Sequence, residues 1–301
     1  MTETMEAQVA ELVSDDAMQS ASEIFQQVRR RLFGIAYRML GSVADAEDIL
    51  QETWIRWQRT DRAEVDEPAA FLATITTRLA INSLQSAHSR RETYIGPWLP
   101  EPVNTEEDPS LGAEKAEALS FAMLLLLEKL TPTERAAYVL REAFDYPYEH
   151  IAEIVGSSPA AARQLVSRAR KHIASERHVE APAPAQRRLL ETFLDAARRG
   201  ATAELEALFA EDIVSYTDGN GVKLAARIPV AGVARVAKFI AAFSSHFWTG
   251  KQIGWVELNG QPALTLSENG VVTTTLTIAA SEDGISRLLW VMSPDKLQHV
   301  A

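Results

Sequence analysis

The chain has 301 residues and no cysteine, so it is long enough for two or three domains but forms no disulfide, thiolate catalyst or cysteine-based zinc site. Its N-terminal sequence, MTETMEAQVAELVSDD, is acidic where a signal peptide is basic, and no run approaches the roughly 18 apolar residues of a membrane span. We therefore expect a soluble, cytoplasmic protein with no membrane partner.

The net charge of −11 argues at first against a nucleic-acid partner, but two short segments account for it. Residues 1–23 hold six acidic residues and no basic one, and residues 101–128 hold seven acidic residues against Lys115. The rest of the chain is close to neutral and can carry local basic faces.

Composition and apolar spacing divide the chain into six segments. We expect an acidic tail over 1–22, an all-helical domain over 23–93, a Pro-rich and acidic linker over 94–113, a second helical domain over 114–178, a short linker over 179–186 and an α+β domain over 187–301.

The first domain shows apolar residues at spacings of three and four from residue 23 to 58, which predicts helix. Gly41 is expected to end the first helix, and Ser42 or Asp45 to cap the next one. Another helix is predicted after Pro68.

Near its start the linker contains GPWLPEP, residues 96–102, which has three prolines and one tryptophan. Prolines keep a backbone extended and reduce the entropy that is lost when it is held in a groove. Trp98, Leu99 and Pro100 are therefore candidate anchors of a latch rather than parts of a plain spacer.

The second helical domain contains YEHIAEIVGSSPAAARQLVSRARKHI, residues 148–173, with the length and turn of a helix-turn-helix. Helix starts are predicted at Thr131-Pro132-Thr133-Glu134 and at Ser158-Pro159. A solvated basic face on an ordinary helical hairpin is the alternative interpretation. The polar face that could contact DNA contains Arg163, Gln164, Ser167, Arg168 and Lys171.

The sequence pattern changes in the last domain. Two amphipathic helices near 185–199 and 202–210 precede strand-like runs, and a further helix is expected near 230–246. The predicted strands are DIVSYTD, QIGWVEL, ALTLSE, VVTTTLTIAA and ISRLLWVM. We expect an α+β domain in which a cone-shaped antiparallel sheet wraps round its helices.

Two segments of the first domain carry contrasting polar faces. The run DAEDILQETWIRWQR, residues 45–59, places carboxylates at a helix start beside two tryptophans, of which at least one is expected in the core. The run at residues 67–91 ends with a basic polar face.

Together with the helix-turn-helix, these segments resemble the extracytoplasmic-function group of bacterial sigma factors over residues 23–175. The resemblance implies that residues 23–93 bind core RNA polymerase and read the −10 promoter element, and that residues 114–178 read the −35 element. Its implied partners are promoter DNA and the beta-prime clamp helices and beta flap of the polymerase. The implied polymerase contacts are Asp45, Glu47, Asp48, Gln51, Glu52 and Trp54; the −10 contacts are Arg78, Asn82, Ser86, Arg90 and Arg91; the −35 contacts are Arg163, Gln164, Ser167, Arg168 and Lys171.

The C-terminal domain resembles the SnoaL-like, NTF2-like domain fused to SigJ-type sigma factors, through YIGPWLPEP, DGNGVK at 218–223 and SPDKL at 293–297. This implies control of the sigma factor within the same chain, by activation, inhibition or both, and without a separate anti-sigma factor. The implied interdomain residues are Trp98, Leu99, Pro100, Asp218, Gly219, Gly221, Lys223, Asp295, Lys296 and Leu297.

Two alternatives remain. A stand-alone helix-turn-helix regulator could sense a small-molecule ligand through its NTF2-like domain, and an enzyme would need a pocketed acid–base pair. The candidates for such an acid–base pair are Tyr216, Asp218, His246 and Asp295, and their spacing in the sequence matches no catalytic motif. We therefore expect no catalysis, no catalytic residue, no metal site and no cofactor.

Overall fold

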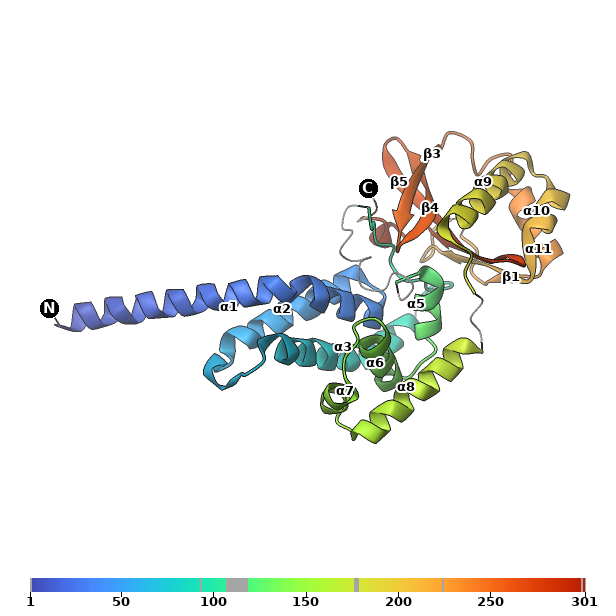
Figure 1. Ribbon diagram of the computed structural model, residues 1–301. Helices are drawn as coiled ribbons and strands as arrows, with labels where there is room; N and C mark the ends of the chain where they lie inside the picture. The colour runs from blue at the N-terminus through green and yellow to red at the C-terminus, as the bar shows by residue number, and fades with distance from the viewer. Residues whose placement is uncertain are drawn as a thin grey trace.

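Helices fill the first half of the chain, and a sheet with three helices fills the second (Figure 1). This confirms the predicted class of two helical units followed by an α+β domain. No helix in the described part of the chain is long and apolar enough to cross a membrane. The computed structural model describes the backbone of residues 2–92, 94–106, 119–175, 179–223, 225–298 and 300, and within these the side chains from residue 18 onward except those of residues 85–92.

The first helical unit contains α1 (Thr2–Leu40), α2 (Val43–Arg59) and α3 (Pro68–Glu92), with a short 3-10 turn, η1 (Arg62–Glu64), between the last two. The segment expected as an acidic tail is helical: residues 2–22 continue α1, which projects beyond the other helices (Figure 1). The physical reason is local: the segment has no glycine or proline before Gly34 and is rich in helix formers such as Ala, Glu and Gln.

The break between α1 and α2 lies where the sequence predicts it. Gly41 has a φ of +68°, in the left-handed region that ends helices, and its N–H donates to the Tyr37 carbonyl at 2.7 Å. Of the two candidate caps, Ser42 acts: its hydroxyl accepts from the Asp45 N–H at 3.2 Å.

Of the two tryptophans on α2, Trp57 is the one in the core. It is fully buried, and its indole N–H donates to the Ala21 carbonyl at 3.0 Å. Trp54 is only partly buried and packs against Phe25, with ring centroids 5.1 Å apart. The second ring therefore remains available at the surface.

The second helical unit has both predicted helix starts. Thr131 and Glu134 form a complete capping box, and the Ser158 hydroxyl accepts from the Ala161 N–H with Pro159 at the first helical position. Gly156, with a φ of +66°, ends the first helix of the helix-turn-helix. The helices are α5 (Phe121–Leu127), α6 (Pro132–Glu142), α7 (Tyr148–Val155) and α8 (Pro159–Ala174).

The C-terminal domain packs its three helices on a curved six-stranded sheet of order β2-β1-β6-β5-β4-β3 (Figure 1). Among the described strands, β1 and β6 pair in parallel, and the other neighbours are antiparallel. The elements are α9 (Ala183–Arg199), α10 (Thr202–Leu208), β1 (Phe209–Asp218), β2 (Val230–Ala231), α11 (Val233–Ala242), β3 (Gln252–Leu258), β4 (Gln261–Glu268), β5 (Val271–Ser281), β6 (Gly284–Val291) and the 3-10 turn η3 (Pro294–Lys296).

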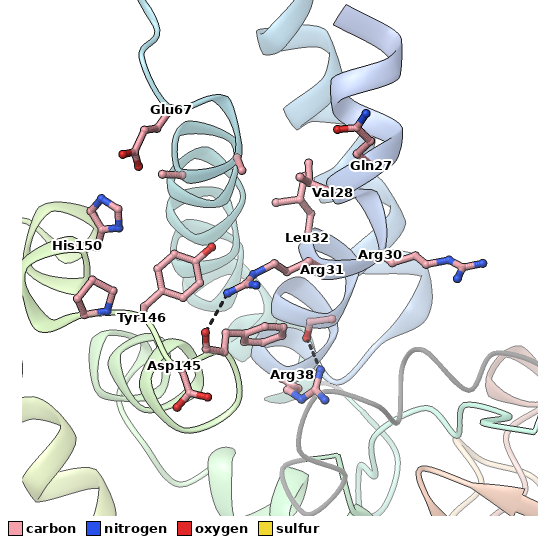
Figure 2. A pocket seen from close by; sticks show the side chains of 15 residues that line it. Gln27, Val28, Arg30, Arg31, Leu32, Arg38, Glu67, Asp145, Tyr146 and His150 are labelled. Atoms are coloured by element: carbon pink, nitrogen blue, oxygen red, sulfur yellow. Dashed lines mark hydrogen bonds between the residues drawn. The ribbon is translucent and has the colours of Figure 1, made fainter.

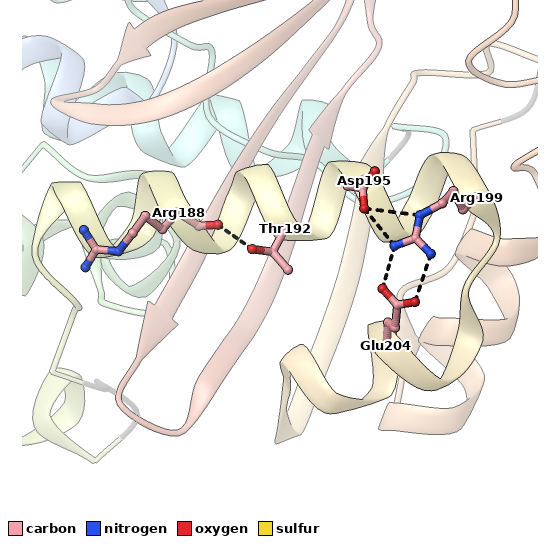
Figure 3. A network of polar contacts seen from close by, with 5 residues as sticks. All are labelled: Arg188, Thr192, Asp195, Arg199 and Glu204. Atoms are coloured by element: carbon pink, nitrogen blue, oxygen red, sulfur yellow. Dashed lines mark hydrogen bonds and ion pairs between the residues drawn. The ribbon is translucent and has the colours of Figure 1, made fainter.

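The short linker ends earlier than predicted, because α9 begins at Ala183 and residues 183–186 form its first turn. Proline is tolerated there, since the first N–H groups of a helix have no partner within it. At the other end of α9, Arg199 binds Asp195 and Glu204 and so fixes the turn into α10 (Figure 3).

Apolar packing joins the units. One core cluster runs from Ala21 to Ile173, so both helical units share it, and a second fills the sheet and its helices. A third contains Leu99 of the linker and Phe121 of α5 together with buried residues of the sheet and of the C-terminal turn. The linker therefore lies between the helical units and the C-terminal domain.

Candidate functional site: the DNA-facing helices and the interdomain joint

The acidic face of α2 borders a groove of about 380 Å³ between α1 and α2. Asp48 and Gln51 are exposed there, and Trp54 forms part of the wall. Glu47 accepts from Arg29 at 2.6 Å, and Glu52 accepts from Arg56 at 2.8 Å. Asp45 is partly buried at the start of the same helix. Of the six residues expected to bind polymerase, Glu47, Asp48, Gln51 and Trp54 line this groove, and Asp45 and Glu52 lie outside its lining.

The −10 candidate Arg78 is exposed, and its guanidinium also binds the helix-turn-helix. Its Nε donates to the Ile154 carbonyl at 3.0 Å and its Nη2 to the Glu153 carbonyl at 2.6 Å. These carbonyls lie at the C-terminal end of α7, where the helix dipole favours a cation. Asn82 is exposed. The other −10 candidates lie outside the described side chains, namely Ser86, Arg90 and Arg91.

A second joint links α1 to the loop between α6 and α7 (Figure 2). Arg31 donates to the Phe144 carbonyl at 2.9 Å, and its guanidinium lies 5.0 Å from the ring centroid of Tyr146. Arg38 lies 5.1 Å from the centroid of Phe144. These side chains line a cleft of about 690 Å³ between the two helical units.

Arg135 of α6 is almost fully buried. It donates to the Met39 carbonyl at the end of α1 at 2.6 Å and to Glu128 at 2.7 Å. Burial lowers the pKa of Arg135 to about 10, which leaves the guanidinium charged at neutral pH. The bond to Met39 connects the two helical units, and the bond to Glu128 connects α6 to the end of α5 within the second unit.

The exposed face of α8 contains all five −35 candidates. Arg163 pairs with Glu149 at 3.4 Å, and Arg168 pairs with Glu134 at 2.9 Å. Burial acts to raise the pKa of the Glu134 carboxyl, but hydrogen bonds from Arg168 and Thr131 outweigh it and lower that pKa. The others on this face are Gln164, Ser167 and Lys171.

A buried ion pair in the C-terminal domain, Asp218 with Lys296, binds the linker. Asp218, at the end of β1, is fully buried and accepts from Lys296 at 2.6 Å, from the Leu99 N–H at 2.7 Å and from the Tyr94 hydroxyl at 2.5 Å. Lys296 also donates to the Leu99 carbonyl at 2.5 Å. Burial, with the nearby Asp218 carboxylate, raises the pKa of the Tyr94 phenol, which therefore stays protonated as a donor.

Trp98 lies between the C-terminal domain and the first helical unit. The Lys296 ammonium sits 4.2 Å from the centroid of its ring. On the other side a Cβ added at Gly41 would lie 2.8 Å from the ring, so the helix break also leaves room for the indole. Leu99 and Pro100 are buried next to it.

The remaining residues expected at this joint divide into two groups. Gly219 is buried, and a Cβ there would lie 2.2 Å from the Ala225 Cβ, so only glycine fits. Gly221 has a φ of +86° and approaches Ile95 of the linker. Leu297 is buried in the third core cluster, whereas Lys223 and Asp295 are exposed.

Sequence reasoning missed a further joint between the C-terminal domain and the helical units, centred on Asn259 in the β3–β4 turn. This buried amide donates to the Tyr37 hydroxyl at 2.8 Å and to the Leu119 carbonyl at 3.2 Å, and it accepts from the Val103 N–H at 3.0 Å. Tyr37 in turn donates to the Glu101 carbonyl at 2.5 Å. One side chain therefore contacts both helical units and the linker. The sequence feature that could have indicated the turn is Asn259-Gly260, a dipeptide typical of tight hairpin turns.

The interior of the C-terminal domain is nearly filled. Aromatic rings of α11 and the following turn pack against Trp248 and Trp290 and leave a cavity of about 30 Å³. Cavities that take drug-sized ligands are roughly ten times larger or more. Asp218 faces the linker rather than this cavity, and His246 is exposed. Among the described residues, no group of three or more acidic or histidine side chains could hold a metal ion.

Comparison with known proteins agrees with this architecture. The Sigma-70 region 2 model matches residues 24–90, and the Sigma-70 region 4 model matches residues 120–173. The crystal structure of the extracytoplasmic-function sigma factor SigJ of Mycobacterium tuberculosis superposes with a TM-score of 0.74 at 32% identity, covering 91% of this chain and 97% of that one.

Full-length relatives extend the similarity into the C-terminal domain. The probable sigma factor SigI of M. tuberculosis is 29% identical over 89% of this chain and 92% of its own. SigJ from the same species is 37% identical over 90% of this chain and 91% of its own. On this similarity and the two region matches, the chain belongs to the extracytoplasmic-function family of RNA polymerase sigma factors, which direct the polymerase to promoters.

Proposed function

We propose that this protein binds core RNA polymerase through the acidic face of α2, reads the −10 element with α3 and the −35 element with α8, and is regulated in cis by its C-terminal domain. The exposed carboxylate of Asp48 and the partly exposed carboxylate of Glu47, beside Trp54, support the first part, because an aromatic anchor with acidic groups around it suits a basic partner surface. The fitting partner surfaces are the beta-prime clamp helices for α2 and the beta flap for the second helical unit.

The contact made by Arg78 supports a closed resting arrangement of the two helical units. It brings the −10 helix within hydrogen-bond distance of the helix-turn-helix. Promoter elements centred near −10 and −35 lie about 25 base pairs apart, or about 85 Å at 3.4 Å per base pair. The two units therefore have to separate before both elements are bound, and binding to polymerase would drive that separation.

The contacts between the C-terminal domain and the linker support regulation in cis. Asp218 and Lys296 hold Leu99, and Asn259 holds Val103, so the C-terminal domain stabilises the linker in the closed arrangement. A chain that carries its own restraint needs no separate anti-sigma factor. The nearly filled cavity gives little support to control by a small-molecule ligand.

Charge reversal on α2 tests the polymerase-binding part of the proposal. We expect Asp48→Lys with Glu52→Lys to reduce the affinity for core polymerase at least tenfold, because the exposed carboxylate of Asp48 and the partly exposed carboxylate of Glu52, which would face basic residues, are replaced by positive charges that repel them. Promoter-dependent transcription in vitro should fall in parallel, and both are measured with the full chain and purified core enzyme.

The matched control is Glu282→Lys with Asp283→Lys in the exposed β5–β6 turn, which changes the net charge equally at a distant surface. It should leave both readouts unchanged. Equal losses in the two double variants would show that the effect is one of overall charge, and unaltered polymerase binding by the α2 variant would contradict the proposed docking face.

A further inference from the structure

The arginines of α8 are each held at the edge of the helix by a carboxylate from a neighbouring element. Arg163 pairs with Glu149 of α7 and also lies 5.1 Å from the Tyr148 ring centroid. On the other side of the helix Arg168 pairs with Glu134. Arg170 donates to Glu142 of α6 at 2.7 Å. An arginine that left its pair to contact DNA would leave an acidic side chain facing the phosphates.

A different set of residues forms the outward stripe of α8. Ala160, Gln164, Ser167 and Lys171 are all exposed. At about 100° per residue they fall within a sector of roughly 60°, and the paired arginines lie on its two flanks. No side chain in the described ranges forms a hydrogen bond with Gln164.

We propose that Gln164 is the residue of α8 that determines base specificity, and that it reads an adenine of the −35 element in the major groove. This inference rests on the proposed function of α8 as the −35 reader. The NH2 group of a glutamine amide can donate to adenine N7 while its oxygen accepts from the adenine N6 amine. Adenine is the base whose major-groove edge offers this acceptor and donor side by side.

The neighbours of Gln164 fit this role. Ala160 and Ser167 are small, so the helix can approach the base edges closely on both sides of the amide. Lys171 lies about one turn beyond Ser167 on the same stripe, at a position suited to a backbone phosphate. The paired arginines are positioning residues, since they fix α8 against α6 and α7 and add positive charge at the groove edges.

The test is transcription in vitro by core polymerase loaded with the full chain. A promoter is first selected with the unmodified protein, and its −35 element is then randomised to give the pool of templates. We expect the unmodified protein to prefer adenine at one position by about 5- to 150-fold, the range of a good bidentate contact. Gln164→Ala should reduce that preference below about twofold at this position alone, and Gln164→Arg should shift it to guanine.

Two further variants separate specificity from general binding. Arg163→Ala should lower transcription from all promoters by a similar factor and leave the base preferences as they are, whereas Gln252→Ala, an exposed glutamine on β3, should change neither. An adenine preference that survives Gln164→Ala, or one that is lost with Arg163→Ala instead, overturns the inference. Failure of the unmodified protein to select any promoter overturns the proposed function itself.

Discussion

Replacing Asp218 with alanine should release the linker and reduce the stability of interdomain docking by about 3–5 kcal/mol, the usual cost of breaking a buried ion pair by removing one partner. The pair is well buried, since Asp218 is 0% and Lys296 9% exposed. Without the carboxylate, the Lys296 ammonium, the Tyr94 hydroxyl and the Leu99 N–H lose an acceptor together.

Hydrogen exchange of the full chain is the direct measurement for this variant. The Leu99 amide and its neighbours should exchange much faster, while α2 and α8 keep their protection. If the closed arrangement competes with polymerase binding, as we propose, the apparent dissociation constant for core enzyme should also fall, by about tenfold if 1.4 kcal/mol of the lost energy came from that arrangement.

The control is Asp212→Ala on the same strand, which removes an exposed ion pair with Arg287 at 3.2 Å. Exposed pairs contribute about 0–1 kcal/mol, so this change should leave linker exchange and polymerase affinity nearly unaltered. Faster exchange throughout the C-terminal domain of the Asp218 variant would instead identify the residue as a support of that domain's core, and the proposed restraint would then be wrong.

The elements that sequence predicts well are those specified by short-range patterns. The end of α1 at Gly41 and the starts at Thr131 and Ser158 follow from residues that lie within four positions of each boundary. The strand β3 covers the predicted QIGWVEL, because alternating and β-branched residues between turn signals define it locally. Over residues 2–22 the structure adds the point at which the first helix begins.

The interdomain contacts could be predicted only in part. The proline-rich stretch indicated that the linker is held, and the SPDKL and DGNGVK segments indicated the domain that holds it. The partner of each side chain was not predictable, because Asp218 and Leu99 are 119 positions apart and Arg78 and Ile154 are 76 apart. No periodicity or spacing relates such pairs. For Arg78, the sequence identified an exposed cation near DNA-binding residues, but not that backbone carbonyls of α7 engage it.

Replacing Asn259 with alanine should uncouple the C-terminal domain from the helical units. The side chain makes three hydrogen bonds in a buried joint, and its loss leaves the Tyr37 hydroxyl, the Val103 N–H and the Leu119 carbonyl each short of a partner. Buried groups left unsatisfied cost about 1–3 kcal/mol each, so we expect a loss of about 3–5 kcal/mol when partial relaxation is allowed for. In scanning calorimetry the variant should unfold in two separated transitions, one for each main core cluster.

Backbone strain has to be separated from the lost hydrogen bonds, and the chain offers a matched position for this. Asn259 and Asn269 both precede a glycine in a hairpin turn, with φ of +54° and +52°, but Asn269 is exposed in the β4–β5 turn. Alanine at either position meets the same left-handed penalty of about 1–2 kcal/mol. Only Asn259→Ala also removes interdomain bonds, so the difference between the two variants measures the joint. If both shift the calorimetric profile equally, Asn259 acts through its turn alone, and the coupling between the units must reside in the Asp218–Lys296 pair and the third core cluster.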